Sequence, residues 1–436
     1  MTDKRHNKIL RRLRWSWFPS LHFGDGTLLS VLILSAIMLR RFGQNNAQTA
    51  FYIALLCLPL VLRPLLETIV TYFRGTTKVW ILSAEFVSAL SLWALAFTLP
   101  TAYWLQGTLC FMPFVVMSGV FYNIAAERFY TDRTAAAPRH QTLLARLFGA
   151  AAMLFGFGVM AMIGGNMEVL TRNVRYSWSV VFYVMAGVEF FLWLWHSIFL
   201  PGGQHPYAGE KDLFGMHRGE YDKVVSGMLR GWRNRFMVYF FLLVVMPEAF
   251  LSIMSVLFVI DAPHNGGLGL SPQELALSQG TVGVAAFFLG RAAGSSLMPR
   301  HGLRRWLVPA AAVASLHGLS LLYLSFNLSS SLPAVCVVLL VGNLMFGFSS
   351  SACAAVMRRF AAASRGFALR RAVAISLMSS MLVLFAMSAG LVQMNIGYRQ
   401  FFALVSLMYI ATVLMCILYA FFMKKDSECT GSQEDI

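Results

Sequence analysis

Long apolar stretches recur along the whole chain, and they limit its fold more than any other feature of the sequence. Each can cross a hydrocarbon core of roughly 30 Å as a helix that rises 1.5 Å per residue. The chain is 58% hydrophobic and only 12% charged, whereas a soluble domain is about 25% charged. Strands of a membrane β-barrel would alternate in polarity over about ten residues, which excludes that class. The sequence therefore predicts an all-α polytopic membrane protein.

Hydropathy predicts twelve membrane spans in two halves. We expect them near residues 18–38, 48–72, 78–99, 102–125, 142–164, 176–200, 236–260, 273–298, 304–326, 332–357, 369–395 and 399–423. The longest hydrophilic interruption begins PGGQHPYAGEKD and covers about 201–234. The predicted organisation is a six-helix bundle at 1–200, a cytoplasmic linker at 201–234, a six-helix bundle at 235–424 and a cytoplasmic tail at 425–436.

The distribution of basic residues predicts which side of the membrane each loop occupies. With a cytoplasmic N-terminus, most of the 35 lysines and arginines fall in cytoplasmic segments. These include the N-terminal residues Lys4, Arg5, Lys8, Arg11, Arg12 and Arg14. The outer loops then hold only Arg40, Arg41, Arg172, Arg175 and Arg399. We therefore expect both termini in the cytoplasm, and the formal net charge of +16 requires no nucleic-acid partner.

Two similar turns indicate an internal repeat. RGTTKVW at 74–80 follows the second expected span, and RHGLRRW at 300–306 follows the eighth. Both place an Arg, a basic residue and a Trp at the same spacing, at equivalent positions in the two halves. Such repeats are typical of secondary transporters, in which two bundles rock around a central site.

The stretch GRAAGSSLMPRHGLRRW at 290–306 extends the second turn. Gly290 and Gly294 share one helix face, where a neighbouring helix can pack closely. Arg300, Arg304 and Arg305 could cap the carbonyl ends of helices or pair with acids. Plain topology charge and ordinary small-residue packing explain the same residues equally well.

This stretch resembles the loop signature of the major facilitator superfamily. Arg300, Gly302, Arg304 and Arg305 match the signature, whereas Pro299 occupies its acidic position, so an acid-based latch is not expected. The region 237–326 is more closely similar to AmpG-type muropeptide permeases. The matching features of this region are Glu248-Ala249-Phe250, the turn GLGLSPQELALSQGTVG at 267–283, and the GxxxG-type helix and Arg-rich turn that follow. Separately, HFGDGTLL at 22–29 is similar to the family's Gly-rich start of span one. The family has Asp where this chain has Glu248.

The resemblance implies a major facilitator fold and an activity. It implies proton-coupled import of anhydromuropeptides or related amino-sugar peptides across the bacterial inner membrane, for cell-wall recycling. The partners are then a small solute, H⁺ and the lipid bilayer, and the fold is compatible with a monomer. Two alternatives stay open: a transporter of another solute, such as a drug, sugar or carboxylate, and a membrane scaffold without transport.

Ionisable residues inside spans are costly and by default indicate function. The candidates are Asp25, Arg63, Glu67, Glu85, Glu189, Glu248 and Arg291. Arg63 and Glu67 stand four residues apart on one helix face, with Pro64 loosening the backbone between them. They could be a self-satisfied pair, or Glu67 could hold Arg63 in place to grip an anionic substrate group through its guanidinium fork.

Glu248 lies near the middle of the seventh span, directly after Pro247, which we expect to kink the helix. A carboxyl group buried there suits reversible protonation near neutral pH. We expect Glu248 to be the proton-coupling site or part of the substrate cradle, or else a hydrogen-bonded structural acid.

The other polar candidates could have purely structural roles instead of functional ones. Asp25 could lie at an unwound helix end facing a cavity or act as a simple cap. Glu85 could serve packing, and Arg291 could neutralise an acid on another helix. Asn123, Gln279 and Asn343 could bond sugar hydroxyls, although bonding between helices is the commoner use.

Motifs for catalysis and cofactor binding are absent from the sequence. There is no Walker loop, nucleophile elbow or HExxH motif, and no Cys/His cluster with metal-ligand spacing. The six cysteines do not suggest a disulfide framework, and the nine histidines are scattered. We therefore expect neither an enzyme nor a bound metal or cofactor.

Overall fold

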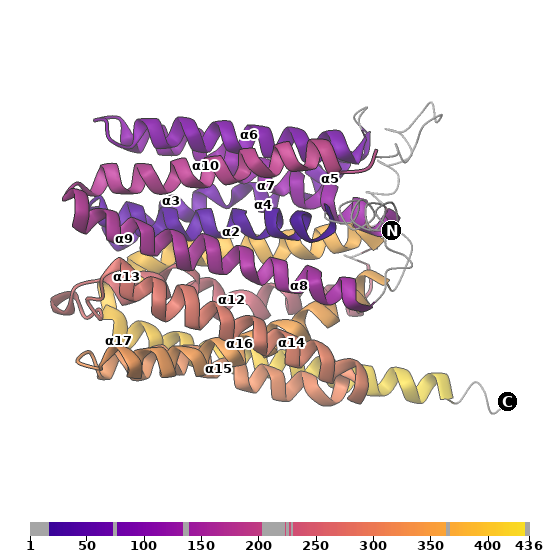
Figure 1. Ribbon diagram of the computed structural model, residues 1–436. Helices are drawn as coiled ribbons and strands as arrows, with labels where there is room; N and C mark the ends of the chain where they lie inside the picture. Colours follow the sequence, from indigo (N-terminus) through magenta and orange to yellow (C-terminus); the bar gives the residue numbers. More distant parts are fainter. Residues whose placement is uncertain are drawn as a thin grey trace, which may run out of the picture. The chain divides into compact units, whose positions relative to one another are not determined.

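The computed structural model describes residues 17–72, 76–133, 139–202, 223, 226–227, 230–362 and 367–431. The N-terminal basic residues, most of the expected 201–234 linker and the last residues of the expected tail lie outside this part of the chain. Figure 1 shows the described residues as helices joined by short loops.

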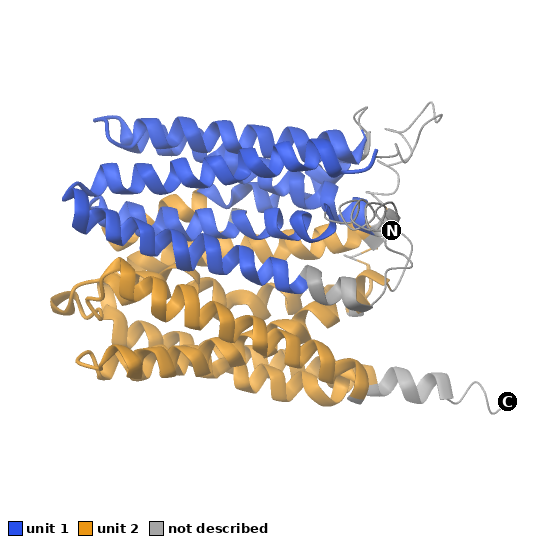
Figure 2. Ribbon diagram, viewed as in Figure 1, with its two compact units in different colours: residues 1–43, 56–219 blue, residues 44–55, 220–436 orange. Residues whose placement is uncertain are grey.

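The chain divides into two compact units, coloured separately in Figure 2. Unit 1 contains residues 1–43 and 56–219, and unit 2 contains residues 44–55 and 220–436. Residues 44–55 thus belong with the C-terminal half of the sequence, which the prediction of two consecutive halves did not anticipate. The boundary expected at 201–234 stays a prediction.

Among the described residues, unit 1 contains nine complete helical segments. They are α2 (Trp17–Arg41), α4 (Leu58–Val61), α5 (Arg63–Tyr72), α6 (Thr77–Thr98), α7 (Trp104–Arg133), α8 (Arg139–Met153), the π-helix η1 (Leu154–Val159), α9 (Met160–Thr171) and α10 (Val174–Phe199). Helix α3 (Asn46–Leu56) follows α2 in the chain but lies in unit 2 except for its last residue. Helix α6 packs against both α7 and α10, and α2 packs against α8.

Unit 2 contains the remaining segments. They are α12 (Trp232–Ile260), the short 3-10 helix η2 (Pro263–Asn265), α13 (Pro272–Leu275), the π-helix η3 (Ala276–Gly283), α14 (Val284–His301), α15 (Leu303–Phe326), α16 (Leu332–Ala362) and α17 (Phe367–Gly431). Helix α12 packs against α17, and α16 packs against α14 and α15.

Ten helices of the described chain are long and apolar enough to cross a membrane. The structure differs from the expected spans in the stretch 48–72. The stretch 48–72 is divided into α3, α4 and α5, because the chain leaves helical geometry near Cys57 and Leu62. Pro64 then occupies the first turn of α5, where a proline is tolerated. The last two expected spans are two helices within α17 that meet at Gly397, whose φ of 78° and ψ of 164° are not helical.

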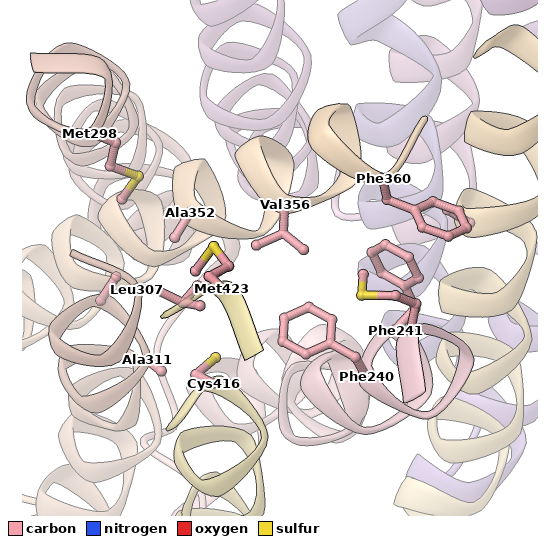
Figure 3. Close-up of a cluster of buried hydrophobic side chains, with 13 residues drawn as sticks. Phe240, Phe241, Met298, Leu307, Ala311, Ala352, Val356, Phe360, Cys416 and Met423 are labelled. Carbon is pink, nitrogen blue, oxygen red and sulfur yellow. The ribbon is translucent and has the colours of Figure 1, made fainter. Parts of the chain in front are cut away.

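An apolar cluster at one end of unit 2 joins five of its helices (Figure 3). Phe240 and Phe241 of α12 lie beside Phe360 of α16, and the rings of Phe241 and Phe360 meet edge to face at 5.3 Å. Met298, Leu307 and Cys416 bring α14, α15 and α17 into the same cluster. Lipid tails are as apolar as these side chains, so close packing rather than water exclusion holds them together.

Small residues set the closest helix contact, as the sequence predicted for Gly290 and Gly294. A Cβ on Gly290 would lie 1.9 Å from the carbonyl oxygen of Leu344, and one on Gly294 would lie 2.0 Å from Ser351 Oγ. Gly347 of α16 faces back toward α14 in the same way. The backbones of α14 and α16 therefore touch along this stripe.

The two Trp residues of the repeated turns make equivalent contacts. Trp80 stacks on Phe121 with a centroid separation of 5.3 Å, and Trp306 meets Phe348 at 5.8 Å. In each half of the chain, the turn after the second expected span thus places its Trp against a Phe of the fourth expected span. The contacts agree with an internal repeat.

Lys78, the basic residue of the first repeated turn, caps the end of α10. Its Nζ donates to the carbonyl oxygens of Ser197 at 3.0 Å and Leu200 at 2.7 Å. By contrast Arg300, Arg304 and Arg305 of the second turn are exposed, with no ion pair or capping bond among the described residues.

Lys78→Met should therefore lower the melting temperature of the purified protein by about 2–4 °C, because two carbonyls lose a charged donor worth about 1 kcal/mol. Lys78→Arg is the matched control and should retain most of the stability. An unchanged melting temperature for Lys78→Met would show that solvent satisfies these carbonyls equally well.

Candidate functional site

Most of the ionisable residues expected inside spans lie in three groups, each within one unit. Two groups lie in unit 1, around Arg63 and around Glu85, and one lies in unit 2, around Glu248. Within these groups, the acids and bases lie next to polar partners from other helices.

Arg63 pairs with residues of α7, not with Glu67. Its Nη1 donates to Asn123 Oδ1 at 2.5 Å, and its Nη2 donates to Glu127 Oε2 at 2.7 Å. Glu67 instead accepts from Arg128 of α7, with Nη2 at 2.9 Å from Oε1. The expected Arg63–Glu67 pair was wrong for a physical reason: both side chains face α7, which offers each a partner of opposite charge.

Asn123 connects this group to Asp25. Its Nδ2 donates to Asp25 Oδ1, while its Oδ1 accepts from Arg63. Asp25 lies inside the continuous helix α2, so the expectation of an unwound helix end was wrong. Gly24 and Gly26 allow close helix packing at this position. A Cβ on Gly24 would lie 2.5 Å from Tyr122 Oη, and a Cβ on Gly26 would lie 2.6 Å from Ala152 Cβ.

Glu85 contacts a histidine, His196, that was not among the site residues predicted from the sequence. Glu85 Oε1 lies 2.5 Å from His196 Nδ1, and His196 Nε2 lies 2.8 Å from Ser20 Oγ. Glu85 is 2% exposed and His196 is fully buried. The bonds join α6, α10 and α2 at one point of unit 1. The only sequence signal for His196 was an ionisable residue within an apolar span.

Glu85 also lines a small hollow in unit 1 that is partly open to its surroundings. The hollow lies among α2, α6, α7 and α10, and two further acids, Asp25 and Glu189, reach its wall. Glu189 is buried. The three acids that the sequence placed in separate spans of this half thus meet at one site.

Glu248 occupies the centre of a triad in unit 2. Its Oε2 lies 2.9 Å from His317 Nδ1 of α15, and its Oε1 accepts from the hydroxyl of Tyr409 of α17. The His317 ring stacks on Phe346 at 5.0 Å. Gly318 gives Tyr409 room, since an added Cβ would lie 3.1 Å from its ring. Both oxygens of the carboxyl group are therefore fixed.

The groups around Glu85 and Glu248 follow a common plan. Each joins an acid, a histidine and a hydroxyl residue from the first, third and sixth expected spans of its half. In unit 1 these are Ser20, Glu85 and His196; in unit 2 they are Glu248, His317 and Tyr409. The order of the side chains differs, but the helices that supply them correspond.

A further polar cluster, which the sequence analysis missed, lies at one end of unit 2. Asn46 Nδ2 is 2.8 Å from Asp261 Oδ2, 2.9 Å from Gln393 Oε1 and 3.0 Å from Tyr398 Oη. Tyr398 also donates to Asp261. This cluster explains why residues 44–55 belong to unit 2: the buried amide of Asn46 bonds to α17 and to the end of α12.

The other predicted polar residues have local roles. Gln279 donates to the Ser255 carbonyl at 3.1 Å and so joins η3 to α12. Asn343 donates within α16 to the Leu339 carbonyl. Arg291 lies on α14 with an exposed side chain. None of these residues lies in the three groups described above.

The chain has many helices long and apolar enough to cross a membrane, as in a multi-pass membrane protein, and its fold is similar to those of several solved structures. It is similar to a solved nucleoside transporter, NupG, with a TM-score of 0.67 and 13% identity over 94% of this chain and 99% of that chain. It is also similar to a POT family transporter in complex with 5-aminolevulinic acid, with a TM-score of 0.72 and 11% identity over 94% and 96% of the two chains.

A third similar structure is tetrameric PepTSo2, with a TM-score of 0.65 and 10% identity over 95% of this chain and 99% of that chain. No protein-family profile matches the sequence, and no curated protein matches it. The similarity to all three structures is therefore one of fold.

Proposed function

We propose that the chain is a proton-coupled secondary active transporter that imports anhydromuropeptides or related amino-sugar peptides. The observation that carries the proposal is the Glu248 triad, a carboxyl group inside an apolar helix that is held by His317 and Tyr409. Ionisable residues at such positions are expensive in a membrane and are typical of proton and substrate pathways. The similar folds of nucleoside and POT family transporters support a transport function.

The finer features of this proposal come from the sequence. They are twelve spans in two six-helix bundles, a bacterial inner-membrane location and cytoplasmic termini. The muropeptide cargo rests on the resemblance of 237–326 to AmpG-type permeases. A second candidate is transport of another small solute, which the varied cargoes named for the similar structures favour.

Uptake into proteoliposomes tests the proposal. Labelled GlcNAc-anhydroMurNAc-peptide should accumulate when an inward proton gradient is imposed, and should only equilibrate without one. A labelled nucleoside, a dipeptide and 5-aminolevulinic acid serve as competing cargoes in the same vesicles. Absence of muropeptide uptake by folded protein, together with accumulation of another cargo, would replace the proposed substrate.

Arg63 is the residue that we assign to an anionic part of the solute. Arg63→Lys keeps the charge but loses the fork that reaches Asn123 and Glu127 together, so the initial uptake rate should fall about tenfold. The matched control is Arg128→Lys, which alters the neighbouring pair with Glu67 and should change uptake less. Full uptake by both Arg63→Lys and Arg63→Ala, at normal melting temperature, would remove Arg63 from the site.

A further inference from the structure

The hollow in unit 1 has a wall rich in hydrogen-bond acceptors. Asp25, Glu85 and Glu189 contribute carboxyl groups, and Thr27, Ser88 and Ser118 contribute hydroxyls. No lysine, arginine or histidine is among the described residues that line it. The wall therefore suits a group that is positively charged or that donates hydrogen bonds.

The protons of three hydroxyl groups in the wall are already used. Thr27 Oγ1 donates to the Gly24 carbonyl at 2.7 Å, and Ser118 Oγ donates to the Phe114 carbonyl at 2.6 Å. The Tyr122 hydroxyl, which also reaches the hollow, donates to the Leu21 carbonyl at 2.8 Å. Only lone pairs of these oxygens remain for a ligand, because each hydroxyl carries one proton.

One carboxylate oxygen in the wall lacks a partner. Glu85 is 2% exposed, and its Oε1 is held by His196, but its Oε2 is buried without a hydrogen bond among the described residues. Leaving such an oxygen unpaired costs free energy, about 1–3 kcal/mol or more for a charged group. A donor that reached this oxygen from the hollow would recover that cost, whereas a solute carboxylate or phosphate would add repulsion.

We propose that this hollow binds a primary ammonium group of the transported solute, an inference that rests on the proposed transport function. Such a group carries three N–H donors and one positive charge, which match the acceptors of Glu85, Asp25 and Glu189. A metal ion fits less well, because no group of three or more acids, histidines or cysteines among the described residues could hold one. The solute would thus turn its amine toward unit 1.

Thermal unfolding of the purified full-length chain tests this directly, without any transport step. Methylammonium chloride carries three N–H donors, whereas tetramethylammonium chloride has the same charge and none. At equal ionic strength, methylammonium at tenfold its dissociation constant should raise the melting temperature by about 2 °C. Tetramethylammonium chloride and sodium chloride should not.

Variants assign the effect to the hollow. Glu85→Gln should abolish the methylammonium-specific rise, and Asp25→Asn, which changes an exposed residue and leaves the His196 contact intact, is the second variant. Glu168→Gln is the control, since Glu168 pairs with Arg41 and Trp178 away from the hollow. That variant should lower the baseline but keep the rise.

Three outcomes would overturn the inference. They are no rise with methylammonium, an equal rise with sodium or tetramethylammonium, and a rise that persists in both Glu85→Gln and Asp25→Asn. A specific rise together with failed uptake of every tested cargo would instead reject the proposed transport function and leave the ammonium site standing. The two failures can therefore be distinguished.

Discussion

Glu248→Gln should abolish proton-driven accumulation while it spares exchange of solute across the membrane. Glutamine has nearly the same shape and still accepts the Tyr409 hydroxyl bond, but it cannot gain and lose a proton. Accumulation against a gradient should therefore fall at least about tenfold, toward simple equilibration, since intramembrane acids act as proton carriers. Counterflow exchange in the same proteoliposomes should keep most of its wild-type rate.

The control for Glu248→Gln is another acid that is also replaced by glutamine but that lies away from the Glu248 triad. Glu274 closes the capping box with Ser271 at the start of α13, and a glutamine can replace it in that role. Glu274→Gln should therefore leave both accumulation and exchange unchanged. Equal loss of accumulation and exchange in Glu248→Gln would assign Glu248 a structural role, and retention of both would remove it from the coupling step.

Gly290→Ala should destabilise the protein more than any other single methyl addition that we consider. The new Cβ would lie 1.9 Å from the Leu344 carbonyl oxygen and 2.9 Å from the Phe348 nitrogen. Those atoms belong to the backbone of α16, so no side chain can turn aside and the two helices must separate. We expect a loss of about 3 kcal/mol, near the upper end for overpacking.

Melting temperature and the yield of monodisperse protein measure this effect. Gly347→Ala should behave alike, because its Cβ would lie 2.0 Å from the Phe287 carbonyl oxygen on α14. Gly187→Ala on α10 is the matched control: no atom lies within 4 Å of its added Cβ, and alanine favours a helix by about 1 kcal/mol. A normal melting temperature for Gly290→Ala would show that α14 and α16 are not in close contact.

Much of the fold could be predicted because the relevant forces act locally. A run of apolar residues must form a helix in a membrane, since lipid offers no partner for free backbone groups. The small-residue stripe at Gly290 and Gly294 was predictable for a similar reason, because residues four apart share a helix face whatever the helix packs against. The division of 46–72 into three helices was harder to predict, because Pro59 and Pro64 are compatible either with a kink inside one helix or with the start of a new helix.

The sequence by itself determined that this chain crosses a membrane many times and carries costly ionisable groups at Arg63, Glu85 and Glu248. Tertiary structure alone decided their partners. Arg63 bonds to Glu127 rather than to Glu67, and the histidines that appeared scattered are the ones that hold Glu85 and Glu248. Hydropathy records the burial of a residue, but its partner depends on the rotation and depth of helices far apart in the chain, which only their packing fixes.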